Sequence, residues 1–372
     1  MNQPVPFFQF RDFPAGMQQQ VEQTLVETAR KAHYILGPEV QQFEQEFGQF
    51  LGGAETVMGV GNGYDALVIC LKALGIGPGD EVIVPSNGYR ATVNAVLQAG
   101  ATPVLAEPDA LTYNMTAEGA RKVITSSTKA LLPVHLYGQA CEMEPLLDLA
   151  KAQQLFVIED AAQAHGAAYK GKQAGTFGHC NAFSFYPTKN LGALGDGGAV
   201  VTADEELAAF VRMYRNYGER HKYQSEVVGV NSRLDELQAA VLRVKLWWLE
   251  QLNAERQRLA GVYLQKLQGT GDLLLPVTAK DCSHCYHIFC IRTSYRDQLQ
   301  QWLTEQGVQT AIHYPVPVHL QAAYRFLNFR QGDFPVAEEL AATSLSLPLF
   351  PGLREEEQAR VVQAVKQFFE SI

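Results

Sequence analysis

The middle of the chain alternates short apolar runs with segments of helical periodicity. Between residues 55 and 202, runs rich in Val, Ile, Leu and Ala are separated by amphipathic segments and by turns that contain glycine and proline. This alternation is typical of an α/β domain whose mainly parallel sheet is covered by helices. The expected strands are Thr56–Val60, Glu81–Pro85, Thr102–Leu105, Ala130–His135, Phe156–Glu159, Asn181–Phe185 and Ala199–Thr202, and the expected helices are Tyr64–Leu74, Ala91–Ala99 and Glu142–Gln153.

A long helical pattern carries the chain out of this region. Leucines and valines recur at helical spacing from Leu234 to Leu267. The pattern predicts a large domain over residues 1–250, with a helical segment at its N-terminus, and a smaller C-terminal α+β domain over residues 251–372. In the smaller domain we expect strands at Ile288–Arg292 and Thr310–His313 and helices at Tyr295–Gln306 and Arg354–Phe369.

The charge balance limits the possible partners. The 372 residues carry 30 Lys and Arg against 39 Asp and Glu, which gives a net charge of −9. Binding to a phosphate backbone normally uses a basic face, so we expect no nucleic-acid partner. No apolar run approaches the roughly 18 to 20 residues that cross a bilayer, and residues 1–16 lack the pattern of a signal peptide. We therefore expect a cytoplasmic protein without a membrane partner.

Two of the six cysteines raise the question of a metal site. The segment from Cys282 to His287 holds two thiols and two imidazoles, the side chains that bind zinc. A structural zinc site usually takes its second pair of ligands from farther along the chain. Here all four candidates crowd into six residues that run into a predicted strand, so we expect a loop and no metal.

A glycine-rich turn follows the first predicted strand. Gly59-Val-Gly-Asn-Gly63 lies between that strand and a helix, an arrangement in which backbone N–H groups hold a phosphate. Its spacing is G-x-G-x-G and not G-x-G-x-x-G. The acidic pair Asp80-Glu81 also begins a strand, where a dinucleotide site would need an acid at a strand end. The turn therefore favours a phosphate over a nicotinamide dinucleotide.

Two further segments place charged side chains beside apolar strands. Asp160 follows the apolar run Val157–Ile158 at the edge where open α/β sheets bind ligands. Lys189 lies on a glycine-rich loop between two apolar strands, so its charge is costly and its amine is suited to forming a Schiff base.

These segments together meet the needs of pyridoxal 5′-phosphate. That cofactor requires an amine, an acid beside its pyridine nitrogen, an aromatic face against its ring and donors for its phosphate. In this order, the candidates are Lys189, Asp160, Tyr89, and the Gly63-Tyr64 turn with Ser184.

With these motifs, the chain resembles the DegT/DnrJ/StrS aminotransferases of nucleotide-sugar biosynthesis, which have the fold-type I architecture. The resemblance covers nearly the whole chain. It is carried by Ile35–Pro38, Gly59–Leu67, Gly77–Ile83, Pro133–Gly138, Glu159–Gly166, Ser184–Gly198, Gly229–Ala240, His313–His319 and Leu345–Leu349.

The resemblance implies roles for individual residues. Lys189 would bind the cofactor covalently, Asp160 would pair with the pyridine nitrogen, and Gln163 would bond the 3-hydroxyl. The other implied contacts are stacking by Tyr89, phosphate binding by Ser184, Gly63 and Tyr64, and a phosphate contact by Asn231 from the second subunit of a homodimer.

Two positions depart from the commonest family pattern. Tyr64 stands where many members have threonine after the glycine, and Gly88 stands where many have threonine before the stacking aromatic residue. Two hydroxyl donors are thereby lost. The phosphate should consequently depend more on backbone N–H groups and on Ser184.

Three segments resemble the subgroup that aminates C3 of dTDP-linked 3-keto-6-deoxyhexoses: Tyr186–Gly192, Lys222-Tyr223 and His313-Tyr314. The expected reaction moves an amino group from glutamate to that C3 carbonyl, on a route to deoxyamino sugars of lipopolysaccharide or O-antigen. The candidates for contact with the sugar and its pyrophosphate are His165, Tyr186, Lys222, His313 and Tyr314.

Three other functions share parts of this pattern. Subgroups that aminate C4 of a nucleotide-linked 4-keto-6-deoxysugar share much of the frame. A pyridoxal-phosphate-binding regulator without turnover would usually carry a DNA-binding domain, and no basic helix-turn-helix segment flanks the fold. A dehydratase of the same family would have histidine in place of Lys189.

The polar stretch from Tyr217 to Asn231 bears on assembly. It is too long and too polar to be buried in its own domain, yet it ends in Asn-Ser-Arg and not in linker residues. We expect its tip to serve the active site of a second subunit, where Lys222 would neutralise the pyrophosphate.

Overall fold

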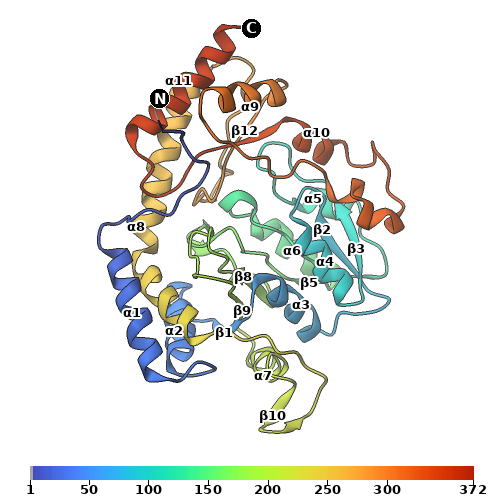
Figure 1. Ribbon diagram of the computed structural model, residues 1–372. Coiled ribbons are helices and arrows are strands. Elements are labelled where there is room, and N and C mark those ends of the chain that lie inside the picture. Colours follow the sequence, from blue (N-terminus) through green and yellow to red (C-terminus); the bar gives the residue numbers. More distant parts are fainter. Residues whose placement is uncertain (1–2) are drawn as a thin grey trace.

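The large sheet combines a parallel group of strands with one reversed strand (Figure 1). The computed structural model describes residues 3–372. Strands β2 (Glu81–Pro85), β3 (Thr102–Ala106), β4 (Thr128–Leu131) and β5 (Phe156–Val157) are parallel and lie in the order β3-β2-β4-β5. Parallel bridges from Asp160 to Val134 and to Ala182 continue this pairing into the next group of strands.

That group consists of β8 (Asn181–Ser184), β9 (Gly198–Thr202) and β1 (Thr56–Val60). Strand β9 is antiparallel to both of its neighbours. A parallel neighbour needs a long crossover, usually a helix. The loop over residues 185–197 between β8 and β9 contains no helix, so the chain returns in the opposite direction. The expectation of a mainly parallel sheet is confirmed, with β9 as the reversed strand.

Most expected elements are present with ends shifted by one or two residues. The predicted end of the strand Ala130–His135 was wrong, because β4 stops at Leu131. Pro133 follows two residues later, and proline has no N–H to donate to a neighbouring strand. The expected strand at Thr310–His313 is only a bridge from Ala311 to Ser346. The matching elements are α3 (Gly63–Ala73), α4 (Arg90–Gln98), α6 (Met143–Gln153), α8 (Glu236–Leu267), β12 (Phe289–Arg292), α9 (Arg296–Glu305) and α11 (Glu355–Glu370).

The other elements had no individual prediction. The two N-terminal helices among them fall in the expected N-terminal helical segment, and most of the rest are too short to show a clear period. These elements are α1 (Met17–Lys31), α2 (Pro38–Phe50), α5 (Ala117–Arg121), η1 (Leu136–Gly138), β6 (Ala168–Tyr169), β7 (Lys172–Gln173), α7 (Glu205–Tyr214), β10 (Glu219–His221), β11 (Gln224–Ser225), η2 (Val318–Leu320), η3 (Ala322–Leu327), α10 (Pro335–Thr343) and β13 (Ser344–Leu347).

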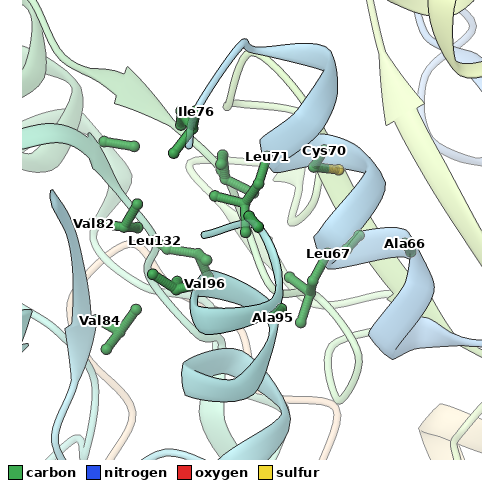
Figure 2. Packing of buried hydrophobic residues seen from close by; sticks show 14 of the residues in the cluster. Ala66, Leu67, Cys70, Leu71, Ile76, Val82, Val84, Ala95, Val96 and Leu132 are labelled. Carbon is green, nitrogen blue, oxygen red and sulfur yellow. The ribbon is translucent and has the colours of Figure 1, made fainter. Parts of the chain in front are cut away.

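Helices α3 and α4 cover one face of the sheet (Figure 2). Leu67 and Leu71 lie four residues apart on α3, and they share a buried cluster with Val96 of α4 and Val82 of β2. This spacing is that of an amphipathic helix with one apolar face. The packing fixes the N-termini of both helices at the edge of the sheet where the parallel strands end.

An aromatic cluster joins helix α2 to strand β8, which lies beside the reversed strand. Phe43 and Phe47 of α2 are fully buried against Phe183 and Phe185, which flank the end of β8. The Phe47 ring lies 5.1 Å from that of Phe183 and 5.5 Å from that of Phe185, both edge to face. Such pairs add to the stabilisation from buried area.

The long helix α8 takes part in two hydrophobic cores. Leu242 and Leu249 pack in the aromatic cluster described above, whereas Leu259 and Tyr263 pack with the C-terminal elements. Figure 1 shows α8 running from the region of α1 and α2 to the region of α9 and α11. We propose a domain boundary near residue 250, inside this continuous helix. Within residues 3–372, no helix is long and apolar enough to cross a membrane.

Replacing Phe47 by alanine should leave a cavity among the aromatic rings. We expect Phe47→Ala to lower the free energy of unfolding by about 3 to 5 kcal/mol, measured by denaturant titration. Phe326→Ala is the control, because that side chain is 59% exposed, and it should change the free energy by no more than about 0.5 kcal/mol. Equal effects of the two substitutions would contradict this account of the core.

Candidate active site

A buried carboxylate stands where the parallel strands end. Asp160 follows β5 and bridges the strands on either side of it. Its Oδ2 accepts from the Thr92 hydroxyl at 2.9 Å, and its Oδ1 accepts from the Ala162 N–H at 3.1 Å. Burial raises the pKa of Asp160, and both hydrogen bonds and the charge of Lys189 oppose that rise. The donors therefore favour the ionised carboxylate in an apolar setting.

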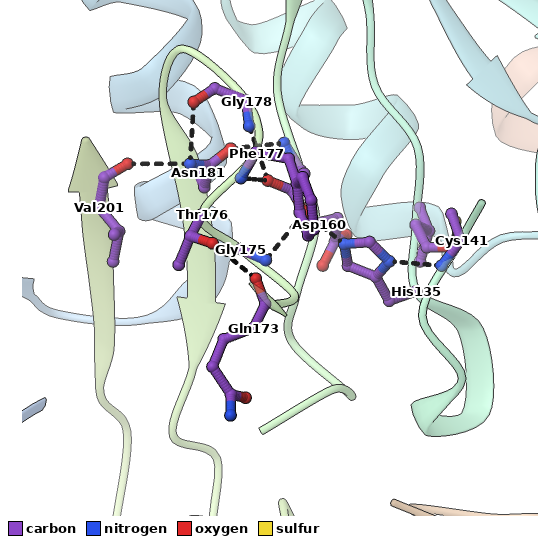
Figure 3. Close-up of polar contacts among 12 residues, drawn as sticks. His135, Cys141, Asp160, Gln173, Gly175, Thr176, Phe177, Gly178, Asn181 and Val201 are labelled. Carbon is purple, nitrogen blue, oxygen red and sulfur yellow. Dashed lines mark hydrogen bonds and ion pairs between the residues drawn. The ribbon is translucent and has the colours of Figure 1, made fainter. Parts of the chain in front are cut away.

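The side chain of the neighbouring residue Glu159 binds a ring and three backbone groups, and Figure 3 labels the residues that carry them: His135, Gly175, Phe177 and Gly178. Its Oε2 lies 2.8 Å from His135 Nε2, and His135 Nδ1 accepts from the Cys141 N–H at 3.0 Å. Because Nδ1 accepts, the ring proton is on Nε2 and points at Glu159. The carboxylate also accepts from the backbone N–H groups of Gly175, Phe177 and Gly178, at 2.8, 2.6 and 2.7 Å.

The orientation of the Gln163 amide is fixed by Tyr137. The Tyr137 N–H donates to Gln163 Oε1 at 2.6 Å, from a residue with a φ of 58°. The Nε2 group of Gln163 must then face the other way, where it lies 3.4 Å from the Tyr314 hydroxyl. Gln163 therefore presents an N–H donor to the site. The Tyr137 hydroxyl donates to the His313 carbonyl, which ties the same residue to the C-terminal part of the chain.

Lys189 lies half-buried on the loop between β8 and β9. Its backbone N–H donates to the Tyr186 carbonyl at 2.8 Å in a tight turn. The turn needs glycine at position 192, since a Cβ there would lie 2.3 Å from the Pro187 carbonyl oxygen. Burial lowers the pKa of Lys189 to about 8, against the opposing effect of the Asp160 charge. The amine is thus partly neutral near physiological pH, as a nucleophilic lysine requires.

His165 is completely buried, which argues against the expectation that it contacts the sugar. Its ring packs 5.4 Å from that of Phe183 and 5.7 Å from that of Phe185. Burial and the nearby charge of Lys189 lower the pKa of His165 to about 3, so the ring is neutral. Neither ring nitrogen has a hydrogen-bond partner within residues 3–372. The sequence could not show this, because the motif gives no sign of which side of the loop the ring takes.

The His313-Tyr314 segment meets Tyr89 across the site. The rings of Tyr89 and Tyr314 lie 5.2 Å apart. His313 Nδ1 lies 2.8 Å from the Ser346 hydroxyl, which leaves Nε2 for another contact. Burial and the charge of Lys189 lower the pKa of His313 to about 4, so it would offer an uncharged imidazole. The structure therefore brings together Tyr89, Asp160, Gln163, Lys189, His313 and Tyr314.

The expected phosphate site lies where α3 begins beside the end of β8. A Cβ on Gly63 would lie 2.5 Å from the Cβ of Ser184, so only glycine allows this approach. Asn62 caps the helix by accepting from the Asp65 N–H at 2.8 Å, which leaves the N–H groups of Gly63 and Tyr64 at the positive end of α3. These donors and the Ser184 hydroxyl fit a phosphate.

The residues present also fit the rest of pyridoxal phosphate. An amine of lowered pKa, a buried ionisable carboxylate and a directed amide N–H stand beside an aromatic ring that is 39% exposed, that of Tyr89. Each is a group that the cofactor requires at a different atom. The half-exposed Tyr186, at 53% exposed, lies three residues before Lys189 on the same loop.

Lys222 and Asn231 lie apart from this group in a single chain. The hairpin of β10 and β11 projects beside α7 (Figure 1), and Lys222 is in its turn, 5.1 Å from the Tyr223 ring centroid. Asn231 is exposed and pairs through its backbone with Asn216. In the described part of the chain, no side-chain hydrogen bond or ion pair joins either residue to Lys189 or Asp160.

Two residues of the site were missed by the sequence analysis. Thr92 holds Asp160 and Tyr137 orients Gln163, each across a large separation along the chain. Thr92 lies three residues after Tyr89, in the first turn of α4. Its closeness in sequence to Tyr89 was the one signal that could have identified it. Tyr137 is within a family motif, but its role depends on a backbone N–H and so leaves no trace in the side chain.

Four other histidines have local structural partners. His135 binds Glu159, His179 accepts from the Val157 N–H, His284 accepts from the Tyr286 N–H, and His319 binds Glu338. Across residues 3–372, no group of three or more His, Cys, Asp or Glu side chains is arranged to hold a metal ion.

Comparisons with known proteins give a consistent match over the whole chain. Residues 16–366 match the model of the DegT/DnrJ/EryC1/StrS aminotransferase family. The chain is 46% identical to the dTDP-3-amino-3,4,6-trideoxy-alpha-D-glucose transaminase of Streptomyces venezuelae, over 99% of this chain and 97% of the relative. It is also 46% identical to the dTDP-3-amino-3,6-dideoxy-alpha-D-galactopyranose transaminase of Aneurinibacillus thermoaerophilus, over 98% and 99%.

The fold is similar to solved structures of the same kind. The X-ray structure of S. venezuelae DesV, in complex with a ketimine intermediate, superposes with a TM-score of 0.97 at 46% identity and covers 100% of both chains. A DegT/DnrJ/EryC1/StrS aminotransferase from Brucella abortus superposes with a TM-score of 0.92 at 36% identity, over 97% of this chain and 99% of the other.

The lowered pKa of Lys189 predicts how the cofactor-free protein captures an aldehyde. Only the neutral amine attacks, so the rate of capture should rise with pH through a midpoint near 8 and level off above it. An exposed lysine would give a midpoint near 10.4, about the ordinary value. The measurement is the rate of pyridoxal phosphate uptake against pH. Asp160→Asn removes a charge that raises the pKa, so its midpoint should be lower than that of the wild type; a wild-type midpoint near 10 would contradict the prediction.

Proposed function

Since the chain belongs to the DegT/DnrJ/EryC1/StrS aminotransferase family, we propose that it transfers the amino group of glutamate to the C3 carbonyl of a dTDP-linked 6-deoxyhexose. Its cofactor is pyridoxal 5′-phosphate. The observation that carries the proposal is the joining of Lys189, Asp160 and Gln163 at one edge of the sheet. The chain that carries these three residues is 46% identical to each of two transaminases of dTDP-linked 3-amino sugars.

Lys189 would both hold the cofactor and move a proton. When bound, pyridoxal phosphate supplies an electron sink for the bond that loses its proton. With a pKa near 8, the Lys189 amine is neutral often enough to attack and basic enough to accept a proton at neutral pH. Its turn, closed by the hydrogen bond to the Tyr186 carbonyl, limits how far the amine can move between these tasks.

Asp160 and Gln163 would set the charge distribution around the ring. A buried carboxylate that keeps its charge favours a proton on a nearby ring nitrogen. Thr92 and Ala162 hold the carboxylate in place. Gln163 has its oxygen occupied by Tyr137, so its Nε2 would be left to donate to the 3-hydroxyl oxygen of the cofactor. We propose that Tyr89 stacks on the ring and that Gly63, Tyr64 and Ser184 bind the phosphate.

The sugar would lie against the exposed side of this group. We propose that His313 Nε2, the Tyr314 hydroxyl and Tyr186 contact the hexose. A neutral imidazole and a phenol suit the hydroxyl groups of a sugar, since each both donates and accepts. His165, being fully enclosed, is proposed to support the Phe183–Phe185 packing behind Lys189 in place of its expected contact with the sugar.

We further propose a homodimer in which each hairpin serves the other subunit. The hairpin and the segment after it expose Tyr223 and Val228, which are 84% and 95% exposed in the single chain. Exposed apolar side chains of this size are typical of contact surfaces. Asn231 would then reach the phosphate of the partner, and Lys222 the pyrophosphate of its substrate.

Two further expectations concern cellular context. A nucleotide-linked sugar carries a pyrophosphate and does not cross membranes unaided, so an enzyme that uses it would act in the cytoplasm, where it is made. We propose that the product supplies a deoxyamino sugar for lipopolysaccharide or O-antigen.

The reaction can be tested in its two halves. Glutamate alone should discharge the yellow absorption of the purified protein, and a dTDP-linked 3-keto-6-deoxyhexose should restore it and yield a product aminated at C3, located by NMR. Lys189→Ala should lower kcat by at least about a thousandfold. Lys151→Ala, an exposed position, is the matched control and should retain activity. Amination only of a 4-keto substrate would replace the C3 assignment with C4.

Shared sites can be tested by mixing inactive subunits. Lys189→Ala protomers and Lys222→Ala/Asn231→Ala protomers should each be inactive as homodimers. After subunit exchange, a heterodimer would pair one doubly altered site with one intact site. Since about half of the dimers are mixed and each has one intact site, about a quarter of the wild-type activity should return. A mixture that stays inactive after demonstrated exchange would show that each protomer builds its own site.

A further inference from the structure

Arg90 is a cation at the mouth of the site with no role in the reaction as described so far. It is the first residue of α4, directly after Tyr89, and both side chains are exposed. Its guanidinium lies over the Tyr89 ring, 4.9 Å from the ring centroid. Stacking of this kind fixes the guanidinium plane while its N–H donors stay free at the edge.

The charge of Arg90 is not balanced within the described chain. Over residues 3–372, its side chain makes neither an ion pair nor a hydrogen bond, whereas Arg215, Arg243 and Arg292 each bind a carboxylate. Arg90 also stands at the N-terminus of α4, where the helix dipole disfavours a positive charge. An anion bound beside Arg90 would remove both costs at once.

The neighbours of Arg90 place it close to Tyr314 and Tyr324. Thr92, in the same helical turn, binds Asp160. Asn94 lies one turn further along the Arg90 side of α4, and its Oδ1 accepts from the Tyr324 hydroxyl at 2.7 Å. The charge of Arg90 also lowers the pKa of Tyr314 and Tyr324, opposing the larger rise that burial causes. Arg90 therefore lies on the side of α4 that meets the segment over residues 314–324.

We propose that Arg90 binds a carboxylate of the amino donor. The inference rests on the proposed function. In glutamate the α-carboxylate is attached to the carbon that gives up its amine, so its partner must stand next to the ring that Tyr89 covers. The pyrophosphate of the sugar nucleotide is on C1, two carbons away from a reacting C3, and Lys222 of the second subunit is already proposed to bind it. The planar guanidinium matches a carboxylate with two parallel N–H donors.

The test compares Arg90→Ala with wild-type holoenzyme in the first half-reaction, without sugar nucleotide. The Kd for glutamate, from the concentration dependence of the absorption change, should rise about tenfold to a hundredfold, as expected for loss of a charge-assisted hydrogen bond. Calorimetry with glutarate, a dicarboxylate that cannot react, should show a weakening in the same range. The Kd for dTDP should stay within about twofold. Arg90→Lys should recover part of the binding, since lysine keeps the positive charge but lacks the two parallel N–H donors of the guanidinium.

Controls separate the possible failures. Arg121→Ala removes an exposed arginine elsewhere and should match the wild type in every measurement. If Arg90→Ala loses its cofactor, Arg90→Gln, which keeps a long stacking side chain, takes its place under the same criteria. Unchanged glutamate and glutarate binding in a folded variant would overturn the proposal, as would weaker dTDP binding with unchanged glutarate binding. A wild-type enzyme that does not react with glutamate would instead overturn the proposed donor.

Discussion

The side chains of Glu159 and Asp160 point to opposite faces of one strand end, and the site depends on this arrangement. Successive side chains of a strand point to opposite faces. Glu159 points away from the site and binds three backbone N–H groups of the loop over residues 175–178 together with His135. Asp160 points into the site and meets α4 through Thr92. A shift of one residue in this register would exchange the two carboxylates and place the anchored one at the ring.

The site also lies at a joint between the two parts of the chain. Tyr137 contacts Gln163 through its backbone and His313 through its hydroxyl, so one residue aligns a donor from the large sheet with the C-terminal wall. Helix α8 packs in a core on each side of the joint, which holds the two parts at a fixed distance. Precision at the cofactor ring thus comes from rigid elements, while the residues proposed to face the substrate are on loops.

Burial shifts the pKa values of several groups of the site in directions that suit pyridoxal phosphate chemistry. It lowers the pKa of Lys189, and with the charge of Lys189 it keeps His165 and His313 neutral. It raises the pKa of Asp160, but two donors and the same lysine oppose that rise. The outcome is one carboxylate and one adjustable amine among uncharged rings. Apolar surroundings alone would neutralise both groups, so the hydrogen bonds to Asp160 are as necessary as the burial.

The sequence by itself determined the elements of the large sheet and the residues most directly tied to chemistry. Short apolar runs located the strands, and the motifs around Asp160 and Lys189 located the carboxylate and the amine, because these signals are local. Local signals cannot say how segments far apart in the chain meet. The tertiary structure alone decided that β9 is reversed, that His165 turns inward, and that the Tyr137 N–H orients Gln163. Each of these depends on packing or on backbone groups that every residue carries, so no pattern of side chains along the sequence could record it.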